Sequence, residues 1–128
     1  MDEGMNMATS GKGKNIALWV LRVVLGLAFL GAGGAKLAGA PPMVAIFSKI
    51  GWGQGFRILT GALEVIGALG LFVPMLTTYA ASLLALVMLG AIGFHLTTLG
   101  GNPAPPIVLL VLSGLTLWLS RPTAAGVK

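Results

Sequence analysis

The sequence contains no cysteine, one histidine and only three acidic residues, Asp2, Glu3 and Glu64. The absence of cysteine excludes thiol–disulfide exchange, a cysteine nucleophile and thiolate-bound zinc or iron–sulfur clusters. A transition-metal site built by this chain alone is not expected either, because such sites need several nitrogen, sulfur or carboxylate ligands. We therefore predict no metal site and no evident cofactor of the chain's own, so any redox role would need a bound molecule or a partner.

Charged residues are also scarce, at 9% of the chain, whereas hydrophobic residues make up 56% of its 128 residues. A chain of this length cannot bury so much apolar surface in one small soluble core, which predicts a lipid bilayer as its environment. A membrane-spanning helix needs about 20 residues. Four apolar runs reach or approach this length, at residues 16–35, 56–73, 76–96 and 106–119.

The predicted fold is all-α, a four-helix transmembrane bundle with a short helix between the first and second spans. This short helix, over residues 43–50, is too short to span and is expected to be interfacial or re-entrant, where it could serve as a lid over the bundle. Residues 15–121 form the single transmembrane domain in this prediction. Residues 1–14 are expected to be a disordered cytoplasmic tail and residues 122–128 a cytoplasmic C-terminal tail.

A signal peptide is the main alternative for the first run. Lys12 and Lys14 precede it, and Ala38-Gly39-Ala40 resembles a cleavage site. Arg22 within the run and Pro41 directly after the cleavage-like segment argue against this alternative.

The basic residues set the predicted orientation. The net charge of +5 would suggest a nucleic-acid partner in a soluble protein, but here lysine and arginine mostly flank the apolar runs, so no nucleic-acid partner is expected. The two ends of the chain carry more basic residues than the loops, which predicts that both termini are cytoplasmic. Four polar residues then fall in the outer half of the membrane: Lys36, Arg57, Glu64 and His95.

Glu64 lies alone in an otherwise apolar run. An ionised, unpaired carboxylate inside a bilayer costs roughly 2.5–3.5 kcal/mol on insertion scales, so Glu64 must be neutral, paired or beside a polar cavity. One hypothesis is an acid–base pair in an apolar pocket, in which Glu64 donates a proton and His95 accepts one. Arg57, Gly61 and Glu64 share one helical face, which should turn toward the bundle interior together with Lys36.

The alternative is structural. Glu64 could bond to Lys36, to another helix or to backbone and only tie helices together. Lys36 and Arg57 could extend to the outer interface, and His95 could meet water at a helix end. Arg22, near the cytoplasmic end of the first run, is expected to be an anchor that extends to the interface. Tryptophans 19, 52 and 118 fit interfacial belts.

Three segments make the chain resemble the DoxX-like family of small bacterial membrane proteins. They are Leu21-Arg22-Val23-Val24-Leu25-Gly26-Leu27-Ala28-Phe29-Leu30 with Gly34-Ala35-Lys36-Leu37, Gly61-Ala62-Leu63-Glu64-Val65-Ile66-Gly67-Ala68-Leu69-Gly70-Leu71 with Pro74, and Met88-Leu89-Gly90-Ala91 with His95. The resemblance covers roughly residues 16–120. It implies a four-helix fold in the bacterial cytoplasmic (inner) membrane, a loose association with quinone-linked redox systems, and a polar signature at Lys36, Glu64 and His95.

Three classes of function follow as expectations. The first is a site for a lipophilic small molecule, with Glu64 and His95 as catalytic residues and Lys36, Arg57, Gly61 and Met88 as substrate-binding residues. Such a site would serve a quinone-linked redox accessory or an acid–base enzyme for epoxide opening, cyclisation or isomerisation. The second class is a proton-coupled small transporter, which would need a homo-oligomer. The third is a non-catalytic assembly subunit, and a membrane redox partner is possible in either the first or the third class.

Overall fold

The computed structural model describes residues 2–122, with side chains described from residue 11, and this part of the chain contains helices and turns without a strand. The elements are α1 (Asp2–Ala38), α2 (Pro41–Ile50), α3 (Gln54–Leu71), the 3-10 turn η1 (Pro74–Leu76), α4 (Thr77–Phe94), the π-helical turn η2 (His95–Leu99) and α5 (Ala104–Ser120). The predicted all-α class is confirmed.

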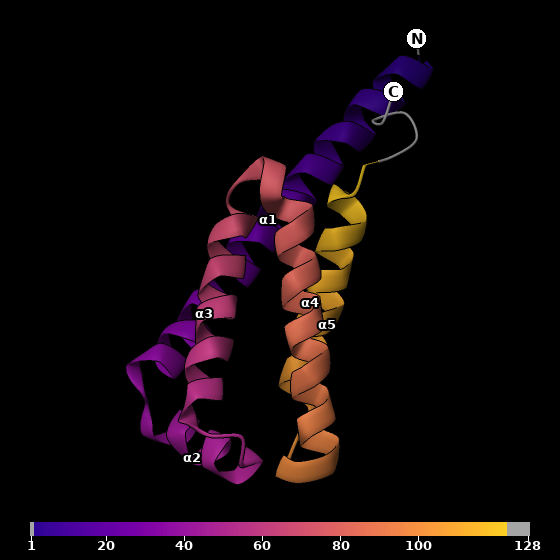
Figure 1. The fold of residues 1–128 in the computed structure, drawn as a ribbon. Helices are drawn as coiled ribbons and strands as arrows, with labels where there is room; N and C mark the ends of the chain where they lie inside the picture. Colours follow the sequence, from indigo (N-terminus) through magenta and orange to yellow (C-terminus); the bar gives the residue numbers. More distant parts are fainter. Residues whose placement is uncertain (1, 123–128) are drawn as a thin grey trace.

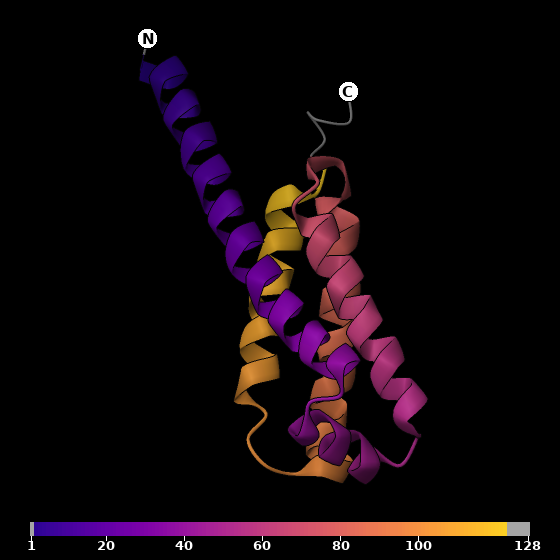
Figure 2. The ribbon, with the colours of Figure 1, turned by 90° about the vertical axis from the view of Figure 1, so that its left-hand side faces the viewer.

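The four longer helices lie side by side (Figures 1 and 2). Helix α1 packs against α3 and α5, and α4 packs against the same two helices. Short helix α2 lies across one end of this array, and the start of α1 and the end of α5 lie at the other end (Figure 1). Consecutive long helices therefore alternate in direction, as expected for helices joined by short connections.

The helix positions agree with the apolar runs. Each predicted run falls within or overlaps one long helix, and the short helix occurs where it was expected, beginning at Pro41. Pro105 and Pro106 occupy the first turn of α5, where proline costs no hydrogen bond. One difference lies at the N-terminus, where α1 already begins at Asp2 although the sequence suggests disorder over residues 1–14. Of the predicted C-terminal tail, residues 123–128 lie outside the described part of the chain.

Close contacts between α3 and α4 are concentrated near the turn that joins them. A Cβ on Gly67 would lie 2.7 Å from a methyl carbon of Leu84, and one on Gly70 would lie 3.0 Å from Ala80 Cβ. The surrounding core includes Leu25, Phe29, Ala68, Leu71 and Leu84 among its fully buried residues. Leu25 and Phe29 belong to the first apolar run, so this run contributes to the core.

Two stretches, Gly11–Ala38 and Pro74–Leu99, are long and apolar enough to cross a membrane by length and composition. Only 28% of the most apolar window of each is buried within the chain, whereas the core helix of a soluble protein would be mostly buried. Helix α5 is apolar but shorter, and α3 carries Arg57 and Glu64. These features indicate a membrane protein.

Candidate functional site

The site begins with a close crossing of α1 and α3 at two glycines. A Cβ added to Gly33 would lie 2.8 Å from the carbonyl oxygen of Gly61, and one added to Gly61 would lie 2.9 Å from the carbonyl oxygen of Gly33. Close approach of this kind requires small residues at a helix–helix interface. Because α1 and α3 run in opposite directions, Lys36 lies beside Gly61 and Glu64 lies beside Gly33, and the two side chains meet across the crossing.

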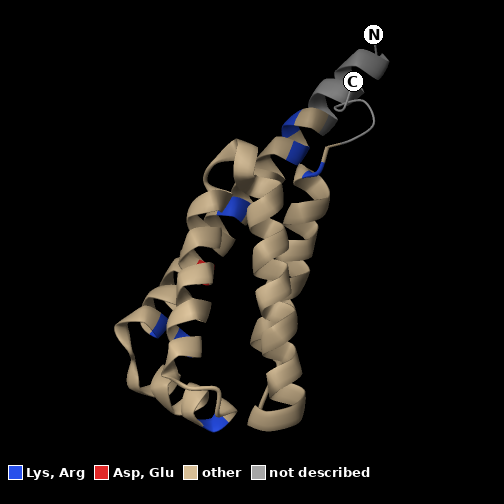
Figure 3. Cartoon of the chain, viewed as in Figure 1, with Lys and Arg blue, Asp and Glu red and all other residues tan. Residues whose placement is uncertain are grey.

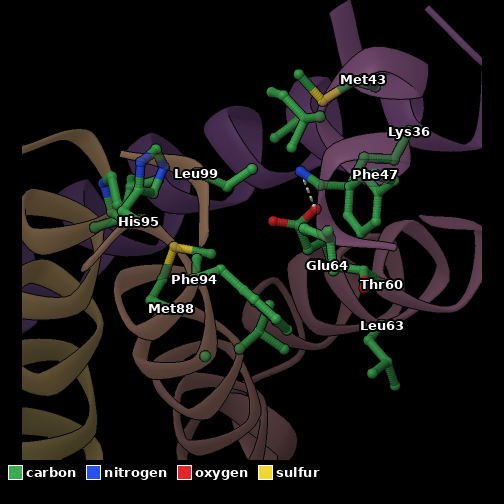
Figure 4. Close-up of a pocket in the computed structure, with 18 of the residues that line it drawn as sticks. Lys36, Met43, Phe47, Thr60, Leu63, Glu64, Met88, Phe94, His95 and Leu99 are labelled. Carbon is green, nitrogen blue, oxygen red and sulfur yellow. Dashed lines mark ion pairs between the residues drawn. The ribbon is translucent and has the colours of Figure 1, made fainter. Parts of the chain in front are cut away.

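Lys36 and Glu64 form an ion pair, with 2.7 Å between Nζ and Oε1. The Glu64 side chain is 1% exposed and that of Lys36 is 15% exposed. The two atoms are close enough for charge pairing, but Oε1 receives no hydrogen bond of good geometry. The other carboxylate oxygen points away from Lys36, toward the side where Met88 and His95 lie (Figure 4). The carboxylate therefore has one oxygen on the ammonium group and one directed into the site.

A pocket of about 420 Å³ lies next to this ion pair. It is walled mainly by apolar side chains, and its polar lining consists of Lys36, Thr60, Glu64 and His95. The apolar lining comes from α1 (Ala32), α2 (Met43, Ile46, Phe47, Ile50), α3 (Phe56, Leu63), α4 (Leu86, Val87, Met88, Gly90, Ala91, Phe94), η2 (Leu99) and α5 (Pro105, Pro106, Leu109). An apolar cavity of a few hundred Å³ with few convergent polar groups is the usual form of a small-molecule site.

His95 is oriented by the π-helical turn that ends α4. Its Nδ1 lies 3.0 Å from the carbonyl oxygen of Gly100, and the backbone N–H of Gly100 donates to the His95 carbonyl at 3.0 Å. Because a carbonyl oxygen can only accept, Nδ1 carries the proton, and in the neutral ring Nε2 is the acceptor. His95 is therefore equipped to accept a proton or a hydrogen bond through Nε2.

Helix α2 covers the pocket at the end of the array. Four of its residues line the pocket at helical spacing: Met43, Ile46, Phe47 and Ile50. Lys49, on another face, donates from Nζ to the carbonyl oxygen of Leu99 at 2.9 Å. The short helix is thus fastened to η2 across the pocket, in agreement with the predicted lid position.

An aromatic cluster joins α2, α3 and α4 beside this cover. The ring of Phe56 lies 5.6 Å from that of Phe47 and 5.9 Å from that of Phe94, measured between centroids. Trp52, expected to be an interfacial anchor, lies 5.0 Å from Phe56 and 5.1 Å from Phe94, and remains 66% exposed. Edge-to-face contacts at these distances stabilise aromatic pairs. Trp52 therefore packs on the cluster as well as facing outward.

Not all of the predicted site residues line the pocket. Lys36, Glu64, Met88 and His95 do. Arg57 instead donates to Gln54 Oε1 at 2.7 Å and to the carbonyl oxygen of Lys36, near the end of α1. Free carbonyl groups at a helix end need such donors. Gly61 does not line the pocket either; it lies at the crossing of α1 and α3, where it faces Gly33.

The sequence interpretation did not identify the lining residues of α2 and α5 or Thr60. Thr60 donates its hydroxyl to the carbonyl oxygen of Phe56, so its hydroxyl proton is already used within α3. The periodic spacing of the four α2 residues was the available signal for that wall. No comparable sequence pattern indicated that Pro105, Pro106 and Leu109 of α5 would line the pocket. Their place in the wall depends on the packing of helices that are distant in the sequence.

Metal ligands do not gather in this site: within residues 11–122, no three His, Asp or Glu side chains lie close enough together to hold an ion. The polar groups that could meet a bound molecule are the Glu64 carboxylate, the Lys36 ammonium group and the His95 imidazole. Their chemistry suits proton transfer and hydrogen bonding.

Comparison with known proteins gives one clear match. The model of the DoxX-like family matches residues 20–116, which includes the glycine crossing, the ion pair, the pocket helices and His95. No curated protein and no solved structure matches the chain significantly. The match spans most of the chain and confirms the resemblance seen in the sequence. The chain belongs to the DoxX-like family.

Proposed function

We propose that this protein spans the bacterial inner membrane with α1, α3, α4 and α5 and binds a lipophilic small molecule in the pocket beside Glu64. The outward faces of all four helices support the membrane placement. Each carries large apolar side chains that are more than half exposed: Leu27, Ile66, Leu89 and Val111 are 62%, 60%, 54% and 61% exposed, respectively. Such surfaces suit lipid, because the backbone groups in the interior of a helix are paired within the helix.

The distribution of basic residues supports an orientation with both chain ends in the cytoplasm. Basic residues lie at the end of the array that holds the start of α1 and the end of α5 (Figure 3). By sequence, Lys12 and Lys14 belong to the first part of α1, and Arg121 directly follows α5. Lys49, at the opposite end, is tied to backbone. By the positive-inside rule the first end is cytoplasmic, and the pocket then belongs to the outer half of the bilayer.

The observation that carries the ligand proposal is the shared pocket of the Lys36–Glu64 ion pair and His95. The wall is otherwise apolar, and its volume suits a ring or a short chain. A ligand with an apolar body and one hydrogen-bonding end would place that end between the free oxygen of Glu64 and His95. Quinones, isoprenoids and epoxides share this chemistry.

Two uses of such a ligand fit the polar groups. In a quinone-linked redox accessory, the Lys36 ammonium group would donate a hydrogen bond to a quinone oxygen and supply a proton through Glu64 as a partner delivers electrons, while His95 Nε2 would accept a hydrogen bond from the hydroxyl of the reduced quinol. In an acid–base enzyme, Glu64 that has taken a proton from its partner Lys36 would donate it to an oxygen of the substrate, while His95 Nε2 accepted a proton from the substrate. Both uses need the carboxyl proton of Glu64, so both are sensitive to its replacement by an amide.

A structural role is the second candidate, because the ion pair lies at the closest contact between α1 and α3. Transport receives less support. The fully buried apolar residues Leu25, Phe29, Leu71 and Leu84 lie between the pocket and the cytoplasmic end, where a polar route would have to pass. We therefore favour binding over transport.

Native mass spectrometry of gently extracted protein tests the proposal. Wild-type protein should carry a defined lipophilic molecule that is lost in Glu64→Gln. Arg57→Gln is the matched control, because it removes a charge at the same end of the array without altering the pocket wall. Retention of the molecule in Glu64→Gln would contradict the proposed polar contact. Loss in both variants together with lower thermal stability would favour the structural role.

A further inference from the structure

A second pocket lies at the opposite end of the array, where the start of α1 meets the beginning of α4 and the end of α5. Its volume is about 310 Å³. Three cations, Lys14, Arg22 and Arg121, are among its lining residues, together with Leu18 and Thr77. No aspartate or glutamate is among the described residues that line it. This end is the cytoplasmic one in the proposed orientation.

Arg22 is the deepest of the three cations. It is 4% exposed, so it is not the interfacial anchor that the sequence suggested. Its Nε donates at 2.5 Å to the carbonyl oxygen of Leu71 at the end of α3, which also accepts from the Thr77 hydroxyl at 3.4 Å. Its guanidinium group lies 4.0 Å from the ring centroid of Trp19. The nitrogen Nη2 is buried and has no hydrogen-bond partner, so this residue of the pocket wall holds one unsatisfied charged donor.

The other two cations lie at more exposed positions. Arg121 donates from Nη1 to the carbonyl oxygen of Trp118 at 2.6 Å and lies over the Trp118 ring, which keeps its guanidinium group near the pocket. Lys14 and Arg22 are eight residues apart on α1, so they lie on nearby faces, about two turns from each other. Three positive charges around one pocket, with one buried donor unpaired, call for an anion.

We propose that this pocket binds the phosphate group of an anionic phospholipid. Arginine recognises phosphate through paired N–H donors, and basic pockets between helices on the cytoplasmic side are suited to lipid headgroups. A lipid fits better than free phosphate because the exposed rings of Trp19 and Trp118 and the apolar side chain of Leu18 lie beside the cations, where acyl chains would continue. The proposal depends on the membrane placement but not on a ligand beside Glu64.

Tryptophan quenching by brominated lipids tests this site. In Trp52→Phe protein, the remaining tryptophans, Trp19 and Trp118, both lie beside the pocket. The protein is reconstituted with brominated phosphatidylglycerol or brominated phosphatidylcholine at matched fractions. Since each cation near the surface adds attraction equal to about a fivefold change in binding, we expect at least a fivefold preference for phosphatidylglycerol.

Three further substitutions in the Trp52→Phe background locate the preference. Arg22→Gln should bring the preference for phosphatidylglycerol over phosphatidylcholine close to one. Lys14→Gln should lower this preference severalfold without disturbing the buried contact between Arg22 and Leu71. Lys12→Gln is the control, because Lys12 is near the same end but does not line the pocket. Equal losses in Lys12→Gln and Lys14→Gln would mean diffuse surface attraction and would overturn the site.

The remaining outcomes separate this proposal from the membrane placement. Equal quenching by the two lipids in Trp52→Phe protein would overturn the headgroup site and leave the membrane placement intact. Quenching by neither lipid would overturn the membrane placement itself. Loss of the preference on addition of excess inorganic phosphate, but not of sulfate, would assign the site to free phosphate and overturn the lipid assignment.

Discussion

Gly33 and Gly61 face each other so closely that a methyl group on either would lie within 3 Å of the other's carbonyl oxygen. This contact sets the distance between α1 and α3. Lys36 and Glu64 each lie three residues further along their helices, and their ion pair of 2.7 Å follows from that distance. The geometry of the polar site is therefore fixed by two residues that have no polar side chain.

Gly33→Ala and Gly61→Ala should each destabilise the protein, because backbone at the crossing must move to admit the methyl group. Overpacking of this kind costs about 1–3 kcal/mol. Gly34→Ala is the matched control, since a Cβ there meets nothing within 4 Å. Thermal unfolding in detergent measures the difference. Equal melting temperatures for Gly33→Ala and Gly34→Ala would show that the crossing is not tight.

The two members of the ion pair should respond unequally to removal. Lys36→Met leaves the almost fully buried Glu64 carboxylate without its partner, and breaking a buried pair in this way costs about 3 kcal/mol or more. Glu64→Gln should cost less, because Lys36 retains some exposure. The double variant Lys36→Met/Glu64→Gln should be less destabilised than the sum of the single variants. Additive losses of unfolding free energy would argue against direct coupling.

Filling the pocket should weaken ligand binding without harming the fold. Gly90 lines the pocket, and a Cβ there meets nothing within 4 Å, so Gly90→Leu can be accommodated. It should lower occupancy by the co-purified molecule at least tenfold while the melting temperature stays the same or rises, because glycine is a poor helix former. Gly93→Leu, on the same helix but outside the pocket wall, is the control. Equal occupancy in both variants would place the ligand elsewhere.

Trp52 should report ligand entry, because it packs on Phe56 and Phe94, which both line the pocket. In protein carrying Trp19→Phe and Trp118→Phe, titration with a short-chain quinone should quench the fluorescence of Trp52 in a saturable way. Trp52→Phe protein, with its tryptophans at the opposite end, should show only unsaturable quenching. A saturable signal in Trp52→Phe protein instead would move quinone binding to the other end of the array.

Much of the fold could be predicted because it depends on local patterns. Three patterns each predict structure within a single helix. They are the apolar runs, the prolines at the start of α5, and the spacing of Arg57, Gly61 and Glu64 on one face. Within the candidate site, Glu64, His95, Lys36 and Met88 were predicted and do surround one pocket.

What could not be predicted depends on contacts between distant segments. Arg57 lies on the same helical face as Glu64, but it turns toward the end of α1, where it donates to the carbonyl oxygen of Lys36. Arg22 is buried because α3 ends beside it at Leu71, whose carbonyl oxygen accepts from its Nε. In both cases a backbone carbonyl at the end of another helix, which the local pattern does not show, decides where the guanidinium group lies.

The contact between α3 and α4 differs between the two ends of these helices. Gly67 and Gly70 allow close packing near the connecting turn, whereas the opposite end is joined through α2, an aromatic cluster and the lysine contact to Leu99. The segments on either side of α2 contain Gly39, Gly51 and Gly53, all with positive φ. If the proposed ligand binds, we therefore expect α2 and the adjoining helix ends to move apart to admit it, while the core near the turn stays packed.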